Sequence, residues 1–127
     1  MIAILGTGLL GSGFTQALRK RGEDVHVWNR SPARAKALES VGAVAFTDAS
    51  SAVRGASRVH IVVSDDAAVD GVLAQALAGF EPGALVIDHS TTSTAGSRAR
   101  TARTDITYVH APVFMGPKNA AESMVRR

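Results

Sequence analysis

The sequence predicts one α/β domain over all 127 residues, folded as a doubly wound parallel sheet. Short apolar runs rich in Val, Ile and Ala alternate with helical patterns along the whole chain. Parallel strands need crossover connections, and the intervals between these runs are long enough to hold them. The runs contain few polar residues, which is typical of strands covered by helices on both faces.

Six strands and five helices are predicted in alternation. Gly22 and Gly42 end the first two helices, because glycine readily adopts the left-handed conformation found after a helix. Ser31-Pro32 is an N-cap followed by proline at the first helical position, so it opens the second helix. The predicted strands span residues 2–5, 25–28, 43–46, 59–63, 84–87 and 106–109, and the helices span residues 9–21, 32–41, 49–53, 66–77 and 94–103.

Polar caps and one turn delimit the elements of the second half. A Glu-Pro-Gly turn at residues 81–83 precedes the fifth strand. Beyond the sixth strand, residues 111–127 mix loop residues with a helical pattern at residues 120–125. The predicted caps are Asp48 for the third helix, Asp65 or Asp66 for the fourth, and Thr92 or Ser93 for the fifth.

The composition excludes several classes of protein. The chain has no cysteine, which excludes a disulfide framework and a thiolate zinc site, and no other metal site is indicated. No apolar stretch reaches the roughly 18 residues of a membrane span, so a soluble cytoplasmic protein is expected. The net charge is +3, but the basic residues are scattered over helices, and we expect them to lie on solvent-exposed helix faces. Nucleic-acid binding is therefore not expected.

A glycine-rich turn carries the main functional signal. The motif G-x-G-x-x-G lies between the first strand and the first helix, as in Rossmann domains. Its glycines permit the tight turn, the close approach of a pyrophosphate and the packing of helix on strand, while the helix N-terminus attracts phosphate. The residues predicted to bind a dinucleotide are Gly6, Thr7, Gly8, Leu9, Leu10 and Gly11.

The residues after the second strand favour NADP over NAD. An NAD enzyme usually carries an acidic residue there, which bonds the ribose 2′-hydroxyl, whereas this chain has Asn29. Arg30 and Arg34 offer positive charge to a 2′-phosphate, and Ser31 offers a hydrogen bond. The alternative is an arginine that stacks on the adenine of either cofactor, so NAD stays the second choice.

Five segments in order resemble the β-hydroxyacid dehydrogenase family, which includes 3-hydroxyisobutyrate dehydrogenase and is related to 6-phosphogluconate dehydrogenase. They are GTGLLGSGFTQAL, VHVWNRSPARAKAL, VVSDDAAVDGVL, IDHSTTS and HAPVFMGPKNAAE. The resemblance implies that Val63 and Ser64 lie beside the nicotinamide nucleotide, where the family usually has Leu-Pro. It also implies that Thr91 lies near the nicotinamide and Ser90 near the substrate; a helix-capping run is the plainer interpretation of residues 90–93.

The family's substrate loop commonly reads A-P-V-S-G-G, and this chain departs from that pattern. Val113 is retained, whereas Phe114 replaces the serine and Met115 the first glycine. The hypothesis is a carbonyl or imine substrate that is bulkier or less charged than a small hydroxy acid. These three residues are the predicted substrate contacts of the loop.

Family members continue with further strands and a helical domain, which carries a general acid/base lysine in a G-x-x-x-K-x-x-N motif. No such motif occurs here, so no catalytic residue is assigned and the fold is expected to be truncated before those elements. An unpaired sheet edge would then favour a homo-oligomer. The chain alone is expected to bind NADPH weakly and to turn over little.

Two functions follow from these observations. The first is the N-terminal cofactor-binding part of an NADP-dependent oxidoreductase acting on a hydroxy acid, aldehyde, ketone or imine. The alternative is a non-catalytic NADP(H)-binding or sensing module. Of the histidines, His26 and His60 are expected to be structural, while His89 and His110 follow strand ends where ligands bind.

Overall fold

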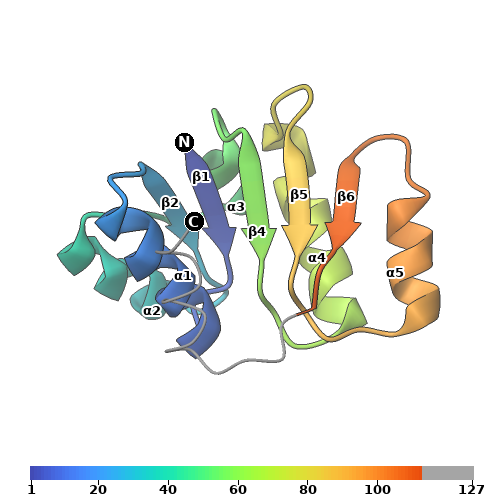
Figure 1. Cartoon of the computed structure of the whole chain (residues 1–127), viewed down its shortest axis with the longest axis horizontal. Coiled ribbons are helices and arrows are strands. Elements are labelled where there is room, and N and C mark those ends of the chain that lie inside the picture. Colours follow the sequence, from blue (N-terminus) through green and yellow to red (C-terminus); the bar gives the residue numbers. More distant parts are fainter. Residues whose placement is uncertain (113–127) are drawn as a thin grey trace.

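The computed structural model describes residues 1–112 and places six strands in one sheet (Figure 1). The strand order is β3-β2-β1-β4-β5-β6, and every neighbouring pair is parallel. This is the order of the doubly wound dinucleotide-binding fold, so the predicted fold class is confirmed. The chain reverses its direction of winding between β1 and β4.

The six predicted strands and five predicted helices up to residue 110 are present, and their ends agree within two residues except for that of the second helix. The helical pattern predicted at residues 120–125 lies outside the described residues. The strands are β1 (Ile2–Leu5), β2 (Val25–Trp28), β3 (Val44–Phe46), β4 (Arg58–Ile61), β5 (Leu85–Asp88) and β6 (Thr107–His110). The α-helices are α1 (Leu9–Lys20), α2 (Pro32–Ala37), α3 (Ala49–Val53), α4 (Asp66–Ala76) and α5 (Thr94–Thr101). Two 3-10 helices, η1 (Leu38–Val41) and η2 (Leu77–Gly79), follow α2 and α4. None of the helices within residues 1–112 is long and apolar enough to cross a membrane.

Two predicted boundaries need correction, whereas the predicted caps are confirmed, including Asp48 at the start of α3. The second predicted helix is α-helical only to Ala37 and tightens into η1 before Gly42, whose φ is +93°. The predicted strand 59–63 ends at Ile61. The Val63 amide donates to the Ser90 hydroxyl and not to a neighbouring strand. Asp65 caps α4 by accepting from the amide of Ala68, and Ser93 caps α5.

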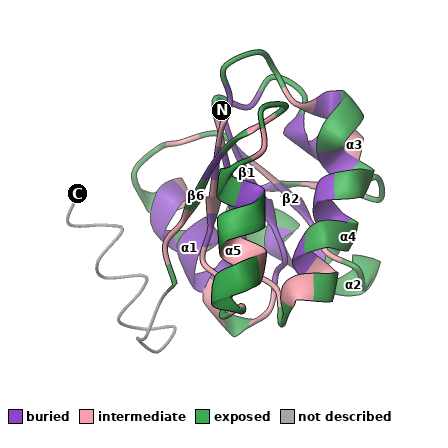
Figure 2. Cartoon of the chain, turned by 90° about the vertical axis from the view of Figure 1, so that its right-hand side faces the viewer, coloured by how far each residue is buried: buried purple, intermediate pink, exposed green. Residues whose placement is uncertain are grey.

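The core has two layers because alternate residues of each strand face opposite sides of the sheet. Ile2 and Ile4 of β1 pack with Phe14 and Leu18 of α1 in one cluster, which also contains residues of α2 and η1. The intervening residues of the central strands pack with α3 and α4 in the second cluster. Figure 2 shows α1 on one side of the sheet and α3 and α4 on the other.

The expectation of uniformly covered strands is wrong at the β6 edge. Val109 is 46% exposed, and Thr107 on the same face is also exposed. The expectation that the basic residues of α5 are solvated is wrong for Arg100, which is only 2% exposed. Both departures arise at the end of the sheet where α5 packs beside β6 (Figure 1).

A polar network joins α4, α5, β5 and β6 around Arg100. Its guanidinium donates to Asp66 at 2.6 Å, to Asp70 at 3.0 Å and to the hydroxyl of Tyr108 at 3.2 Å. The Tyr108 hydroxyl in turn donates to Asp88, which is fully buried. The hydrogen bond from Arg100 lowers the pKa of Asp66 to about 2, and burial raises the pKa of Tyr108. Asp66 therefore does not cap α4; it bonds to α5 and to the loop before it.

Removing the Tyr108 hydroxyl tests the network. Tyr108→Phe leaves one oxygen of the buried Asp88 carboxylate without its donor. We expect the free energy of unfolding to fall by about 1–3 kcal/mol in urea denaturation. Asp105→Asn, which breaks the more exposed pair with Arg103, is the control and should change stability by less than about 1 kcal/mol. Equal effects of the two substitutions would contradict the assignment.

Candidate functional site

The β1–α1 turn contacts the end of β4 so closely that only glycine fits at its first position. Gly6 has a φ of +106°, and a Cβ atom there would lie 2.0 Å from the carbonyl oxygen of Val62. A Cβ atom on Gly11 would lie 1.9 Å from the carbonyl oxygen of Gly6, so α1 packs directly on the turn. By contrast, among residues 1–112 no atom other than those of Gly8 and its two chain neighbours lies within 4 Å of a Cβ built on Gly8. The middle glycine therefore faces open space.

Thr7 leaves a buried oxygen without a partner in the same turn. The residue is 3% exposed, and within residues 1–112 its Oγ1 atom forms no hydrogen bond. A buried hydroxyl without a partner is rare in folded proteins and calls for an explanation, such as a bound ligand or water. The Thr7 backbone, in contrast, is held: its carbonyl accepts from Ser12 at 3.0 Å.

The N-terminus of α1 is open to a negatively charged group. The first N–H groups of a helix have no acceptor within the helix. Gly8 is the N-cap residue of α1, and in the described structure no side chain accepts a hydrogen bond there. The first turn carries no acidic residue, and Leu9 is 79% exposed. The partial positive charge of the helix end, about half a unit, therefore faces the space next to Gly8.

Asn29 links the two turns beside this space. Its Oδ1 atom accepts from the amide of Thr7 at 2.9 Å, and its Nδ2 atom donates to the carbonyl of Ser31 at 3.1 Å. In the sequence, Asn29 is visible only as the residue that replaces the usual acidic one. Its bond to Thr7 spans 22 residues, so no local pattern predicts it, whereas its bond to Ser31 spans only two. Arg30 and Arg34 are exposed next to it, and neither forms an ion pair within the described part of the chain.

The ends of β4 and β5 are tied together through Ser90. The Ser90 hydroxyl accepts from the amide of Val63 at 2.9 Å, and the Ser90 amide donates to Asp88 at 2.9 Å. Ser90 is only 2% exposed, so its hydroxyl fixes the loop after β4. Ser64 and Thr91, the neighbouring residues predicted at the site, are exposed. The predicted contacts Val113, Phe114 and Met115 lie outside the described residues.

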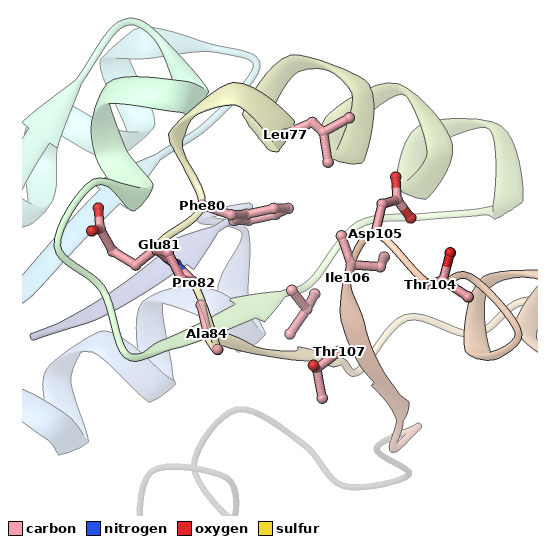
Figure 3. Close-up of a pocket in the computed structure, with 11 residues that line it drawn as sticks. Leu77, Phe80, Glu81, Pro82, Ala84, Thr104, Asp105, Ile106 and Thr107 are labelled. Carbon is pink, nitrogen blue, oxygen red and sulfur yellow. The ribbon is translucent and has the colours of Figure 1, made fainter.

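A pocket of about 290 Å³ lies elsewhere and is not this site (Figure 3). It is lined by residues of η2, of the turn before β5 and of the start of β6, including Phe80 and Ile106. It therefore opens at the amino ends of the strands, whereas ligands of open α/β sheets bind at the carboxyl ends. Within residues 1–112 no group of three or more acidic or histidine side chains is placed to hold a metal ion.

The residues present fit a dinucleotide. A pyrophosphate needs backbone amides and a close approach, and the open space at Gly8 next to the uncapped helix end provides both. The unpartnered hydroxyl of Thr7 and the exposed residues 30–34 lie on the two turns that flank this space.

The comparisons with known proteins agree with this geometry. Residues 1–125 match the model of the NAD-binding domain of 6-phosphogluconate dehydrogenase. The chain belongs to this family. No curated protein matches the chain.

Solved structures place this NAD-binding domain within longer chains. 3-Hydroxyisobutyrate dehydrogenase of Mycobacterium tuberculosis, solved with L-serine, has a TM-score of 0.90 and 30% identity, over 96% of this chain and 43% of its own. An imine reductase from Pseudomonas sp. has a TM-score of 0.80 and 31% identity, over 93% and 42%. An imine reductase from Myxococcus stipitatus in complex with NADP⁺ shares the fold, with a TM-score of 0.84 and 23% identity, over 92% and 42%. The present chain thus spans less than half of each of these proteins.

Two glycine substitutions separate folding from binding. Gly6→Ala introduces backbone strain and a clash with Val62, and we expect it to lower the free energy of unfolding by at least about 1–3 kcal/mol. Gly8→Ala meets no protein atom, so stability should change by less than about 1 kcal/mol, while dinucleotide affinity should fall at least about tenfold. Thermal unfolding and fluorescence titration measure the two effects. Unchanged affinity in Gly8→Ala would place the pyrophosphate elsewhere.

The double role of Asn29 is tested by two substitutions. Asn29→Asp keeps an acceptor for the Thr7 amide and loses the donor to Ser31, whereas Asn29→Ala loses both hydrogen bonds. We expect losses of roughly 1 and 2 kcal/mol in the free energy of unfolding, measured in urea. If Asn29→Ala is as stable as the native chain, the link between the two turns has no energetic role.

Proposed function

We propose that the chain is the cofactor-binding part of an NADP-dependent oxidoreductase. The observation that carries the proposal is the open space at Gly8, between the N-terminus of α1 and the exposed Arg30. The turn of residues 6–11 would hold the pyrophosphate with backbone amides, and Thr7 Oγ1 would gain the partner it lacks. A cytoplasmic location belongs to the same proposal, since nicotinamide dinucleotides are found inside cells.

The preference for NADP rests on charge near the end of β2. Arg30 and Arg34 are exposed without an ion-pair partner among the described residues, and no carboxylate stands where NAD enzymes bind the ribose. Asn29 bonds to Thr7 and Ser31, and the residues proposed to contact a 2′-phosphate are Arg30, Ser31 and Arg34. A charge-assisted hydrogen bond from one arginine supports a preference of roughly ten- to a hundredfold.

The reaction we propose is reduction of a carbonyl or imine group, or the reverse oxidation of a hydroxy acid. When bound, the cofactor would supply the hydride for the reduction and would accept it in the oxidation. Val63 and Ser64 would lie beside the adenosine side of the nicotinamide nucleotide, and Thr91 would lie near the nicotinamide. The Ser90 hydroxyl would hold the two loops together through the Val63 amide. The apolar Phe114 and Met115 favour a substrate that is bulkier or less charged than a small hydroxy acid.

Titration with both cofactors tests the proposed preference. NADPH and NADH are added to the native chain and to Arg30→Ala, and binding is followed by nicotinamide fluorescence. We expect NADPH to bind about ten- to a hundredfold tighter than NADH, and Arg30→Ala to remove most of that difference without weakening NADH.

Arg54→Ala provides the matched control. Arg54 is an exposed arginine at the end of α3, so this substitution removes the same charge away from the β1–α1 turn. It should leave both affinities within about twofold. Equal binding of the two cofactors by the native chain would remove the case for NADP, and no binding of either would remove the proposed function.

A further inference from the structure

Three side chains and one carbonyl form a continuous hydrogen-bonded chain across β4 and β5. Arg58 Nε lies 2.8 Å from His60 Nε2, and His60 Nδ1 lies 2.7 Å from His89 Nε2. His89 Nδ1 then lies 3.0 Å from the carbonyl oxygen of Ala111. The two imidazole planes differ by only 9°, with centroids 5.0 Å apart, so the rings meet edge to edge. We call these four groups the histidine relay.

The two ends of the histidine relay fix every proton within it. The guanidinium of Arg58 can only donate, so His60 Nε2 must accept and the proton of His60 sits on Nδ1. That proton is donated to His89 Nε2, which leaves the proton of His89 on Nδ1. The Ala111 carbonyl can only accept, and it receives this last N–H. Both histidines are therefore neutral and each has one defined tautomer.

The surroundings of the histidine relay oppose protonation. His60 is 4% exposed, and burial, His89 and Arg58 together lower its pKa to about 3. From α1, the ring of Phe14 packs against both histidines, with centroids 6.2 Å from His60 and 4.9 Å from His89, and it adds no charge. A second proton on either imidazole ring would also make two N–H groups face each other, at Arg58 and His60 or at His60 and His89.

The histidine relay ends where the chain leaves β6. The Ala111 amide donates to the Asp88 carbonyl at 2.8 Å, so both polar groups of that residue are held at the end of β5. A third histidine makes the reciprocal contact: His110 Nε2 lies 2.8 Å from the Ser90 carbonyl oxygen. The ends of β5 and β6 are thus joined from both sides, beside the loop that carries Ser90 and Thr91.

We propose that His89, kept neutral and in one tautomer by His60 and Arg58, is the positioning residue that sets where the chain leaves β6. Its Nδ1–H fixes the Ala111 carbonyl, the first anchor of the segment that the sequence assigns to the substrate. The link between Ala111 and a substrate rests on the proposed function. The contact through which His89 acts is its hydrogen bond to the Ala111 carbonyl.

Nuclear magnetic resonance of the 127-residue chain tests the proposal without any variant. Long-range ¹H–¹⁵N spectra report which imidazole nitrogen carries the proton. We expect His60 and His89 both to carry it on Nδ1 at neutral pH, and His60 to stay neutral as the pH falls below 6.5, its ordinary pKa. An Nε2–H tautomer or a charged ring at neutral pH would overturn the proposal.

A variant then separates positioning from general stability. His60→Phe keeps an aromatic ring against Phe14 and leaves His89 Nε2 without its donor. Without that donor His89 can adopt the Nε2–H tautomer, which removes the N–H that binds the Ala111 carbonyl. Hydrogen exchange at the Ala111 amide should therefore become roughly five- to tenfold faster. The Val62 amide, bonded to Leu5 at 2.9 Å, should keep its protection. Exchange that rises equally at both amides, or at neither, would refute positioning.

His26 supplies the matched control. Its Nδ1 atom also lies 3.0 Å from a carbonyl, that of Ala52, and its ring packs against Phe46 with centroids 4.6 Å apart. His26→Phe should leave the Ala111 amide unchanged. NADPH titration of the same samples separates the two proposals. If the chain binds NADPH but His60 and His89 do not show the expected tautomers, only the proposal for His89 fails. If the tautomers are as expected but NADPH does not bind, Ala111 is still anchored and the link to substrate fails.

Discussion

The carboxyl edge of the sheet depends on one close contact, that between Gly6 and the backbone at the end of β4. Because no side chain separates them, the β1–α1 turn rests directly on the Val62 carbonyl. The next residue, Val63, is fixed by the Ser90 hydroxyl, and Ser90 is fixed by Asp88. The loops after β1, β4 and β5 therefore form one continuous unit.

The two halves of the sheet are stabilised by different interactions. Around β1 and β2 the contacts are apolar, with Phe14 and Leu18 packed over Ile2 and Ile4. Around β5 and β6 a charged network centred on Arg100 replaces much of that packing. Breaking one partner of such a network is destabilising because a buried charge is left without compensation. The polar half therefore tolerates fewer single substitutions than its exposure suggests.

Local signals in the sequence were sufficient for the fold and for the glycine turn. Apolar alternation, glycine ends and polar caps depend on residues within one helical turn of each other, and they placed all six strands. The features that escaped prediction pair residues distant in sequence. Arg100 is buried because Asp66 and Tyr108 surround it, and His60 meets His89 only after β4 and β5 pair. The spacing of apolar residues along the chain does not predict contacts between side chains so far apart in the sequence.

The Asn29 amide has a consequence for how this domain accepts insertions. One short side chain spans two turns, from the Thr7 amide to the Ser31 carbonyl, so their lengths are interdependent. Adding or deleting a residue in either turn would move one end of the bridge out of hydrogen-bond reach. Surface loops usually tolerate length changes well. Here the two loops that Asn29 joins are expected to vary in length only together.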